Sequence, residues 1–137
     1  MRFVAADGTE TIIDILTDMP TDTQRNYLNS ITEMDIQLAE KIRNFFLPFE
    51  ELPAMPPKLI LELLQDVSSD IMIKAFTGLD QAVLIKILQA LPERMQRMLH
   101  AGIEANKTAN YEDIEIARKA LVQALRKKIK SRGGLRA

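Results

Sequence analysis

The sequence predicts an all-α fold, in which an array of short helices is followed by one long C-terminal helix. Apolar residues recur at spacings of three and four residues along almost the whole chain, which is the period of an amphipathic helix. No stretch combines alternating polarity with the β-branched residues typical of a strand. Prolines and helix-capping residues divide the helical pattern into separate segments.

Three short helices are expected in residues 8–45. The first begins after Thr9 and ends at Pro20, which interrupts a helix because it lacks an amide proton. Thr21 or Asp22 is expected to cap the second helix, and Asp35 the third. Side chains of this kind accept hydrogen bonds from the free amides at the start of a helix.

Residues 46–57 are predicted to form a hinge, because prolines break the helical pattern at positions 48, 53, 56 and 57. Beyond the hinge, a C-terminal helical segment is expected over residues 58–132. Short helices are expected near residues 57–66, 69–76, 80–90 and 93–105, and a long helix over residues 111–130. Gly133 and Gly134 are expected to end the ordered structure, leaving residues 133–137 as a frayed tail.

A weak internal repeat indicates that the helices stack as an armadillo- or HEAT-like right-handed superhelix. Residues 12–31 align with residues 60–79, and the repeat spacing of 45 to 48 residues is at or just beyond the roughly 40 to 47 of such helical repeats. The identical residues in this alignment are Ile12, Leu16, Asp18 and Asp22, which meet Ile60, Leu64, Asp66 and Asp70. Two unrelated amphipathic helix pairs would also share residues of this kind, and that alternative stays open.

Length and composition favour one binding domain over an enzyme. The chain has 137 residues, within the usual size of a single domain. It has no cysteine, one histidine and no glycine spacing that holds phosphates, so we expect no catalytic residues and no cofactor. No window approaches the roughly 18 apolar residues of a membrane span, and the chain is expected to be cytoplasmic.

The charges are distributed unevenly along the chain. Residues 1–117 carry all 19 acidic residues and 10 of the 18 Lys and Arg, while residues 118–137 carry the other 8. This basic end either complements the dipole of its own helix or steers charged partners. Nucleic acid is not an expected partner, because no aromatic residues are interleaved with the basic ones.

Few side chains suggest a metal site. His100 is the single histidine and has no acidic pair beside it at ligand spacing. Asp66 with Asp70, or Glu50 with Glu51, would be the candidate cation ligands. Such acids more often cap helices or face solvent, because a hard cation needs several converging oxygens. We expect no bound metal.

The order of the local motifs resembles the C-terminal portion of the flagellar motor switch protein FliG family, or a divergent paralogue, over residues 8 to about 134. The residues that carry the resemblance are Gly8, Ile15-Leu16, Leu38-Ala39-Glu40-Lys41-Ile42-Arg43, Phe49-Glu50-Glu51-Leu52, Leu63-Leu64-Gln65-Asp66-Val67, Ala75-Phe76-Thr77-Gly78, Arg94, Asp113-Ile114-Glu115 and Ala117. The resemblance implies a second armadillo-like segment at residues 8–45, which in the family stacks on a neighbouring subunit and contacts the switch protein FliM.

The resemblance also implies roles for the aromatic residues of the hinge. The family's Met-Phe-x-Phe motif falls on residues 46–49, where only the final Phe49 is retained. Pro48 restricts the backbone at this point because its ring fixes φ. Phe45, Phe46 and Phe49 would either seal the junction between the two helical segments or offer an apolar surface to a neighbouring subunit.

A charged helix faces the cytoplasmic loop of the stator in this family, and the resemblance places that helix at about residues 92–106. It implies stator-facing roles for Arg94, Arg97 and Lys107. The family's acidic pair is replaced here by Ala101 and Gly102, and two basic positions are replaced by Thr77 and Asn110. An acidic loop would still be attracted, but an alternating charge pattern would not be read.

The function that the resemblance implies is that of a rotor component, peripheral at the inner membrane face in the flagellar basal body. Its expected partners are a FliM-like switch protein, neighbouring FliG-like subunits and the stator loop. Two alternatives remain open. One is a non-motor helical scaffold or adaptor, and the other is a cation-sensing regulatory domain similar to the N-terminal domains of magnesium transporters.

Overall fold

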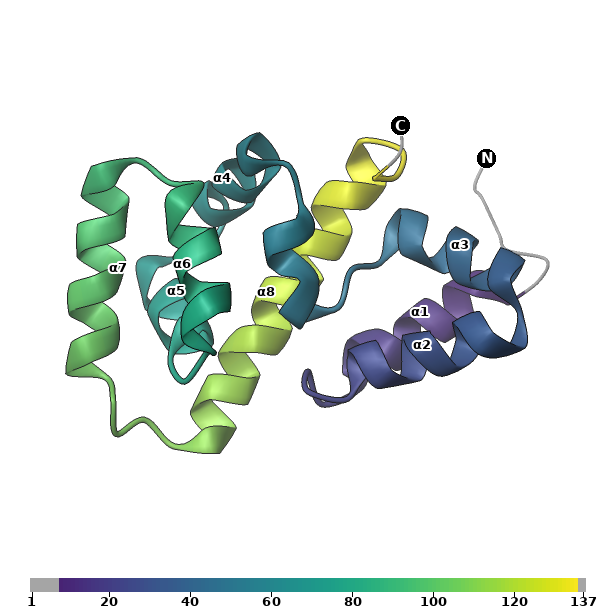
Figure 1. The fold of residues 1–137 in the computed structure, drawn as a ribbon, viewed down its shortest axis with the longest axis horizontal. Coiled ribbons are helices and arrows are strands. Elements are labelled where there is room, and N and C mark those ends of the chain that lie inside the picture. The colour runs from purple at the N-terminus through teal and green to yellow at the C-terminus, as the bar shows by residue number, and fades with distance from the viewer. Residues whose placement is uncertain (1–7, 136–137) are drawn as a thin grey trace.

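The computed structural model describes residues 8–135 and confirms the all-α fold, with no strand in that range. Eight α-helices and one 3-10 helix follow one another along the described chain (Figure 1). Their bounds are α1 Thr9–Asp18, α2 Gln24–Met34, α3 Ile36–Phe45, η1 Phe49–Ala54, α4 Pro57–Gln65, α5 Ser69–Phe76, α6 Gln81–Gln89, α7 Glu93–Ala105 and α8 Tyr111–Ser131.

Helices α1 to α3 form the first group, and their ends follow local capping chemistry in part. Asp35 caps α3 as predicted, because its Oδ1 accepts a hydrogen bond of 3.1 Å from the Leu38 amide. The predicted cap of α2 is wrong, because α2 begins after Thr23 and has no side-chain cap. Thr21 instead bonds to Glu115 of α8, so its oxygen is used in a tertiary contact.

The predicted hinge contains regular structure, because η1 occupies most of it. Pro48 precedes η1 in an extended conformation, and Pro53 lies within the short helix. The segment contributes four buried side chains to the core, those of Phe46, Phe49, Leu52 and Met55. The segment is therefore packed over its length and not an exposed linker.

The helices after the hinge have bounds within two residues of those predicted. Proline stands before or at the first residue of α4 and α7, where a missing amide costs little. Ser68 and Asn110 cap α5 and α8 by accepting hydrogen bonds from the Ile71 and Asp113 amides.

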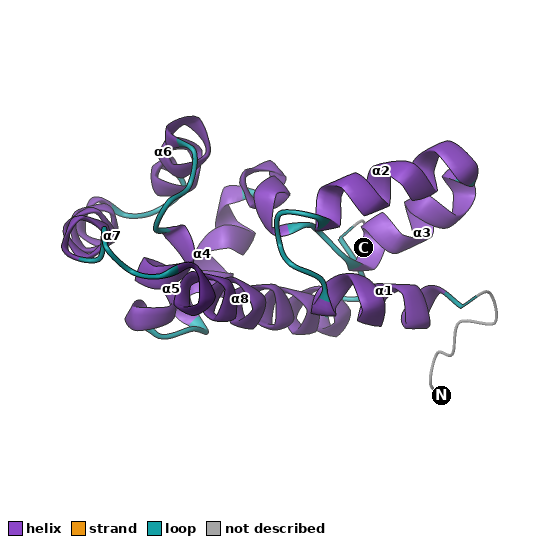
Figure 2. Ribbon diagram, turned by 90° about the horizontal axis from the view of Figure 1, so that it is seen from below, coloured by secondary structure: helices purple, strands orange, loops and turns teal. Residues whose placement is uncertain are grey.

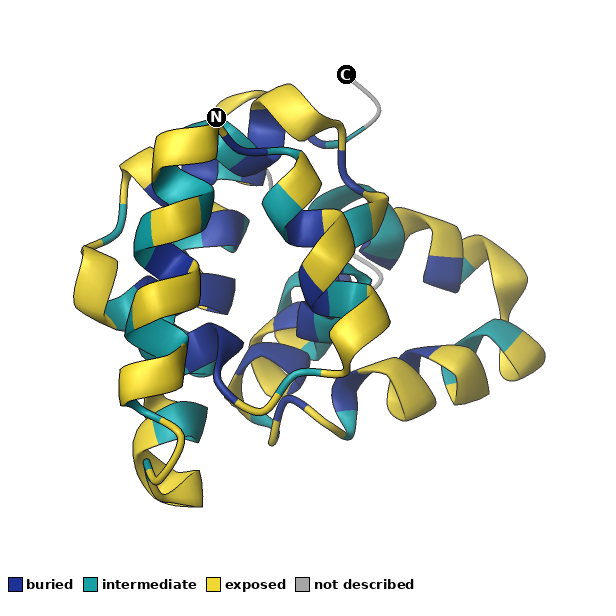
Figure 3. Ribbon diagram, turned by 60° about the vertical axis from the view of Figure 1, so that its left-hand side comes forward, coloured by how far each residue is buried: buried dark blue, intermediate teal, exposed yellow. Residues whose placement is uncertain are grey.

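A second group consists of α4 to α7, and helix α8 runs between the two groups and contacts both (Figures 1 and 2). It packs most extensively on α5, and it also contacts α1, α3, α4 and η1. One buried apolar cluster extends from Ile13 and Leu28 in the first group, through Ile129 of α8, to Leu63 and Phe76 in the second. Exposed residues lie along the outer surfaces of the helices, and buried residues face inward (Figure 3).

The predicted frayed tail is wrong for residues 133–135. Gly133 and Gly134 have φ values of 83° and 115°, which favour glycine, and their amides bond to the Lys130 and Ile129 carbonyls. The Leu135 amide then donates a hydrogen bond of 2.7 Å to the Asn44 carbonyl of α3. The chain after α8 is thus fixed to the first group of helices. Residues 136 and 137 lie outside the described residues.

Candidate partner-binding surfaces

Helix α7 presents one face to solvent and the opposite face to the core. Leu99 is fully buried, while Met95, Met98 and Ile103 pack against the core from half-buried positions. Arg94 and Arg97 are exposed on the other face. This arrangement follows from the three- and four-residue spacing of the apolar side chains.

The basic residues of this surface differ in how far they are neutralised. Arg97 pairs with Glu93 at 3.0 Å, and Lys107 pairs with Glu104 at 3.0 Å, in both cases between well-exposed side chains. Arg94 has no ion-pair partner within residues 8–135. Because exposed ion pairs contribute only about 0.2 to 1 kcal/mol, both neutralised cations remain available to exchange partners.

Gly102 is a packing residue, which explains why an acid is absent at this position. A Cβ atom built on Gly102 would lie 2.4 Å from Cδ1 and 2.7 Å from Cγ1 of Ile73. Real Cβ contacts are not this short, so a side chain at this position would require Ile73 to move or α7 and α5 to separate. Ala101 is exposed beside it and has no such constraint.

The two other positions where the family resemblance implied lost basic residues also have structural roles. Thr77 is buried, and its hydroxyl donates a hydrogen bond of 2.7 Å to the Ile73 carbonyl. Asn110 caps α8, because its Oδ1 accepts a hydrogen bond of 2.8 Å from the Asp113 amide. Gly102, Thr77 and Asn110, which stand where the family resemblance implies charged residues, thus each contribute to the packing or capping of α5, α7 or α8.

The aromatic residues of the hinge lie largely inside the molecule. Phe46 and Phe49 retain 1% and 2% of their exposure, Pro48 is also buried, and Phe45 is half-buried. Their side chains fill the junction between the two groups of helices. Phe46, Pro48 and Phe49 are therefore covered by their own chain in this arrangement. Contact of the hinge with a neighbouring subunit stays a prediction.

Gln24 fixes the hinge to α1, which the sequence analysis did not foresee. Its side chain is fully buried. The Nε2 group donates a hydrogen bond of 3.0 Å to the Leu16 carbonyl, and Oε1 accepts one of 3.2 Å from the Phe49 amide. Gln24 thereby satisfies two backbone groups at helix ends that are far apart in the sequence.

Arg118 of α8 fixes the same segment from the other side. Its guanidinium lies 5.1 Å from the centre of the Phe49 ring and donates hydrogen bonds of 2.9 Å to the Ala75 and Thr77 carbonyls at the end of α5. Burial lowers the pKa of Arg118, and the Glu115 carboxylate opposes that shift. Gln24, Phe49 and Arg118 are called the Phe49 cluster below.

The basic end of α8 is used largely within the chain. Arg126 pairs with Asp14 of α1 at 2.6 Å, and Lys128 pairs with Asp66 after α4 at 2.6 Å. Lys130 lies 3.8 Å from Glu10 of α1. The basic residues at the end of α8 therefore form ion pairs that join this helix to α1 and to Asp66 after α4.

The acidic residues considered as cation ligands have basic partners instead. Asp66 pairs with Lys128 and Asp70 pairs with Lys74, while Glu50 and Glu51 lie near Arg25 and Arg43. No group of three metal-ligating side chains occurs in residues 8–135. In the same range, no helix is both long enough and apolar enough to span a bilayer.

The fold is that of an all-helical domain, whose side chains in residues 8–135 either pack in the core or form exposed charged and apolar faces. A model of the FliG C-terminal domain matches residues 29–133, and the chain belongs to this family. It is 26% identical over 124 residues to the flagellar motor switch protein FliG of Pseudomonas aeruginosa, covering 90% of this chain and 37% of that protein. It is 27% identical over 120 residues to FliG of Vibrio cholerae, covering 88% and 34%.

Solved structures of the same family share the fold. Full-length FliG from Aquifex aeolicus superposes with a TM-score of 0.59 at 25% identity, over 97% of this chain and 41% of that one. A crystal structure of residues 116–343 of FliG from H. pylori gives the same TM-score at 15% identity, over 97% of this chain and 58% of that one. The chain thus spans little more than a third of the length of the matched curated relatives.

Proposed function

We propose that this chain is a protein-binding module of a flagellar rotor, corresponding to the C-terminal portion of the motor switch protein or to a divergent paralogue. The family match over residues 29–133 carries the proposal. The module would act in the cytoplasm, at the inner membrane face of the flagellar basal body, and would bind partners without catalysing a reaction.

The exposed face of α7 is the proposed contact with the cytoplasmic loop of the stator. Arg94 provides a cation with no ion-pair partner among residues 8–135, and Arg97 and Lys107 provide two more whose partners lie on the same exposed surface. An acidic loop would gain several weak contacts here, together with a faster association in the field of the three cations. Ala101 and Gly102 carry no acid where the family has its acidic pair, so a basic group of the loop that pairs at those two positions in the family would find no counterpart there.

Helices α2 and α3 are the proposed contact with a FliM-like switch protein and with neighbouring subunits. Tyr27, Met34 and Ile36 are 57%, 85% and 61% exposed, which is high for large apolar side chains. Tyr27 and Met34 share one face of α2 because they are seven residues apart. Burial of this apolar surface by a partner would stabilise the complex.

Binding measurements on the two faces test the proposal. The chain would be immobilised and exposed in turn to a FliM-like protein and to the stator loop, as a peptide. We expect Arg94→Glu to weaken binding of the stator loop about fivefold, because a contact is lost and a repulsion is gained, while the FliM-like protein still binds. Met34→Asp should have the converse effect.

Lys86→Glu is the matched control, because Lys86 is an exposed lysine on α6 outside both faces. It should change neither affinity more than twofold. If neither partner binds the unmodified chain above an unrelated helical protein, the rotor proposal is rejected.

A non-motor adaptor is the second candidate, and two observations favour it. The Phe49 cluster fixes the hinge on both sides, and Gly102 is committed to packing against Ile73. A fixed hinge and a closely packed α7 would hinder the conformational change of a rotor switch, whereas a static scaffold needs no such change. Deletion of the gene distinguishes the two candidates, because loss of an adaptor leaves swimming speed and reversal frequency unchanged.

A further inference from the structure

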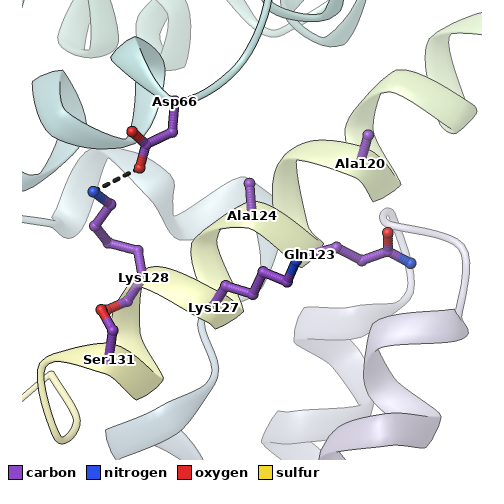
Figure 4. Close-up of a pocket in the computed structure, with 7 residues that line it drawn as sticks. All are labelled: Asp66, Ala120, Gln123, Ala124, Lys127, Lys128 and Ser131. Carbon is purple, nitrogen blue, oxygen red and sulfur yellow. Dashed lines mark hydrogen bonds and ion pairs between the residues drawn. The ribbon is translucent and has the colours of Figure 1, made fainter.

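A basic groove lies between α8 and α4, on a part of the surface that the proposed function does not use. It consists of two adjoining hollows of about 520 and 340 Å³ that share Lys128 and Ser131. Asp66 after α4 and six residues of α8 form the first hollow (Figure 4), while residues 56–62, at and before α4, form the second together with the end of α8.

Small side chains on α8 create the first hollow. Ala120 and Ala124 are four residues apart and therefore lie one turn apart on the same face. Figure 4 shows both alanine side chains on the side of α8 that faces the first hollow, while Lys128 extends across to Asp66 after α4. A longer side chain at either alanine would fill the space, so the groove depends on this pair.

The groove has an excess of positive charge. Four basic residues line the two hollows, Lys58, Lys127, Lys128 and Arg132, against two acidic ones, Glu62 and Asp66. The Lys128–Asp66 ion pair at 2.6 Å neutralises one residue of each sign. Lys58, Lys127 and Arg132 have no ion-pair partner within the described part of the chain and are all exposed.

We infer that this groove binds an acidic, extended segment of a partner protein. Carboxylates of such a segment would pair with Lys58, Lys127 and Arg132 along its length. The Ser131 hydroxyl, which donates a hydrogen bond of 2.9 Å to the Lys128 carbonyl, would accept one from a backbone amide of the segment near the middle. The apolar surface of Ala120 and Ala124 suits small or aliphatic side chains between the acids. A concave site of this size matches a peptide segment better than it matches the flat surface of an anionic bilayer.

The groove is separate from the contacts proposed for the rotor. Helix α7 lies across α5 and α6 from α8, and the exposed apolar residues of α2 and α3 belong to the first group of helices (Figure 1). Binding in the groove can therefore fail while the α7 face still binds the stator loop, and the reverse also holds.

Fluorescence anisotropy with a labelled ten-residue peptide of alternating Glu and Ala tests this inference on the full chain. We expect saturable binding that weakens as salt is raised, because the contacts are between exposed charges. Lys127→Glu and Lys58→Glu should each weaken binding about fivefold or more, and the corresponding Gln-Ala peptide should not bind.

Lys86→Glu on α6 makes the same change of charge outside the groove and should alter the affinity less than twofold. Thermal melts of all three variants would show that each is folded. Absence of binding by the Glu-Ala peptide overturns the inference, as does an equal loss of affinity in Lys86→Glu. Binding of phosphatidylglycerol vesicles in place of the peptide, with loss in Lys127→Glu, would also overturn it and assign the groove to a membrane.

Discussion

Arg118 joins three elements through one side chain. It satisfies two carbonyls at the end of α5 and lies over the ring of Phe49, which begins η1. Carbonyls at the end of a helix lack intrahelical partners, and a charged donor forms stronger bonds to them than a neutral one. A single position on α8 therefore fixes the end of α5 and the start of η1 together.

We expect Arg118→Ala to lower the free energy of unfolding by about 2 to 3 kcal/mol, since two hydrogen bonds from a charged group are lost. Urea denaturation followed by circular dichroism measures the change. Lys119→Ala is the matched control, because the neighbouring Lys119 has no ion pair or hydrogen bond within residues 8–135, and it should change stability by less than about 0.5 kcal/mol. Equal effects of the two substitutions would contradict the role given to Arg118.

Gly102 links the packing of α7 to its charge pattern. Gly102→Asp restores an acid where the family resemblance implies one, but its Cβ would meet Ile73 within 2.4 Å. We expect a loss of about 1 to 3 kcal/mol of stability from overpacking. Ala101→Asp adds the same charge at the exposed neighbour and should change stability by less than about 0.5 kcal/mol. Thermal unfolding of both variants checks this, and a stable Gly102→Asp would show that Ile73 shifts to admit a side chain here.

At the scale of elements, local signals in the sequence were sufficient for the order of the α-helices and for the bounds of α4 to α8. Asp35 caps α3, and prolines mark the starts of α4 and α7, because these effects act within one helical turn. The exposed face of α7 also followed from its apolar spacing alone.

Contacts between distant residues explain what the sequence analysis missed. Thr21 does not cap α2 because Glu115, 94 residues away, accepts hydrogen bonds from its amide and hydroxyl. Leu135 is ordered because its amide reaches Asn44 of α3. Neither contact has a signal in local spacing, since each needs the packing of α8 against the first group of helices.

The Phe49 cluster determines how η1 is held against α1. Gln24→Met keeps the size of the side chain but leaves the Leu16 carbonyl and the Phe49 amide without partners. We expect a loss of about 2 kcal/mol or more, because each buried unpaired group costs about 1 to 3 kcal/mol. Gln89→Met, at an exposed glutamine of α6, is the control for urea denaturation. A Gln24→Met protein as stable as that control would mean that the hinge does not depend on Gln24.

At the scale of the whole molecule, α8 makes the two groups of helices into one body. Its ion pairs and hydrogen bonds reach Asp14 and Thr21 in the first group and Asp66 and Ala75 in the second. The apolar cluster is continuous across the same boundary. Helix α8 thus provides a second connection between the two groups of helices, in addition to the predicted hinge at residues 46–57.

We expect α2 and α5 to unfold in one cooperative transition for this reason. Hydrogen exchange measured by mass spectrometry at increasing urea follows the two helices separately, and their midpoints should coincide. Earlier loss of protection in α2 would show that residues 9–45 unfold independently and that the contacts of α8 with them contribute little.

Motility in the source organism tests the assignment to a rotor most directly. The gene would be deleted and replaced by the unmodified sequence, by Arg94→Glu or by Lys86→Glu, and the swimming speed and reversal frequency of single cells would be recorded. We expect deletion to impair swimming, the unmodified and Lys86→Glu sequences to restore it, and Arg94→Glu to restore it incompletely. Unchanged swimming after deletion would contradict the rotor assignment.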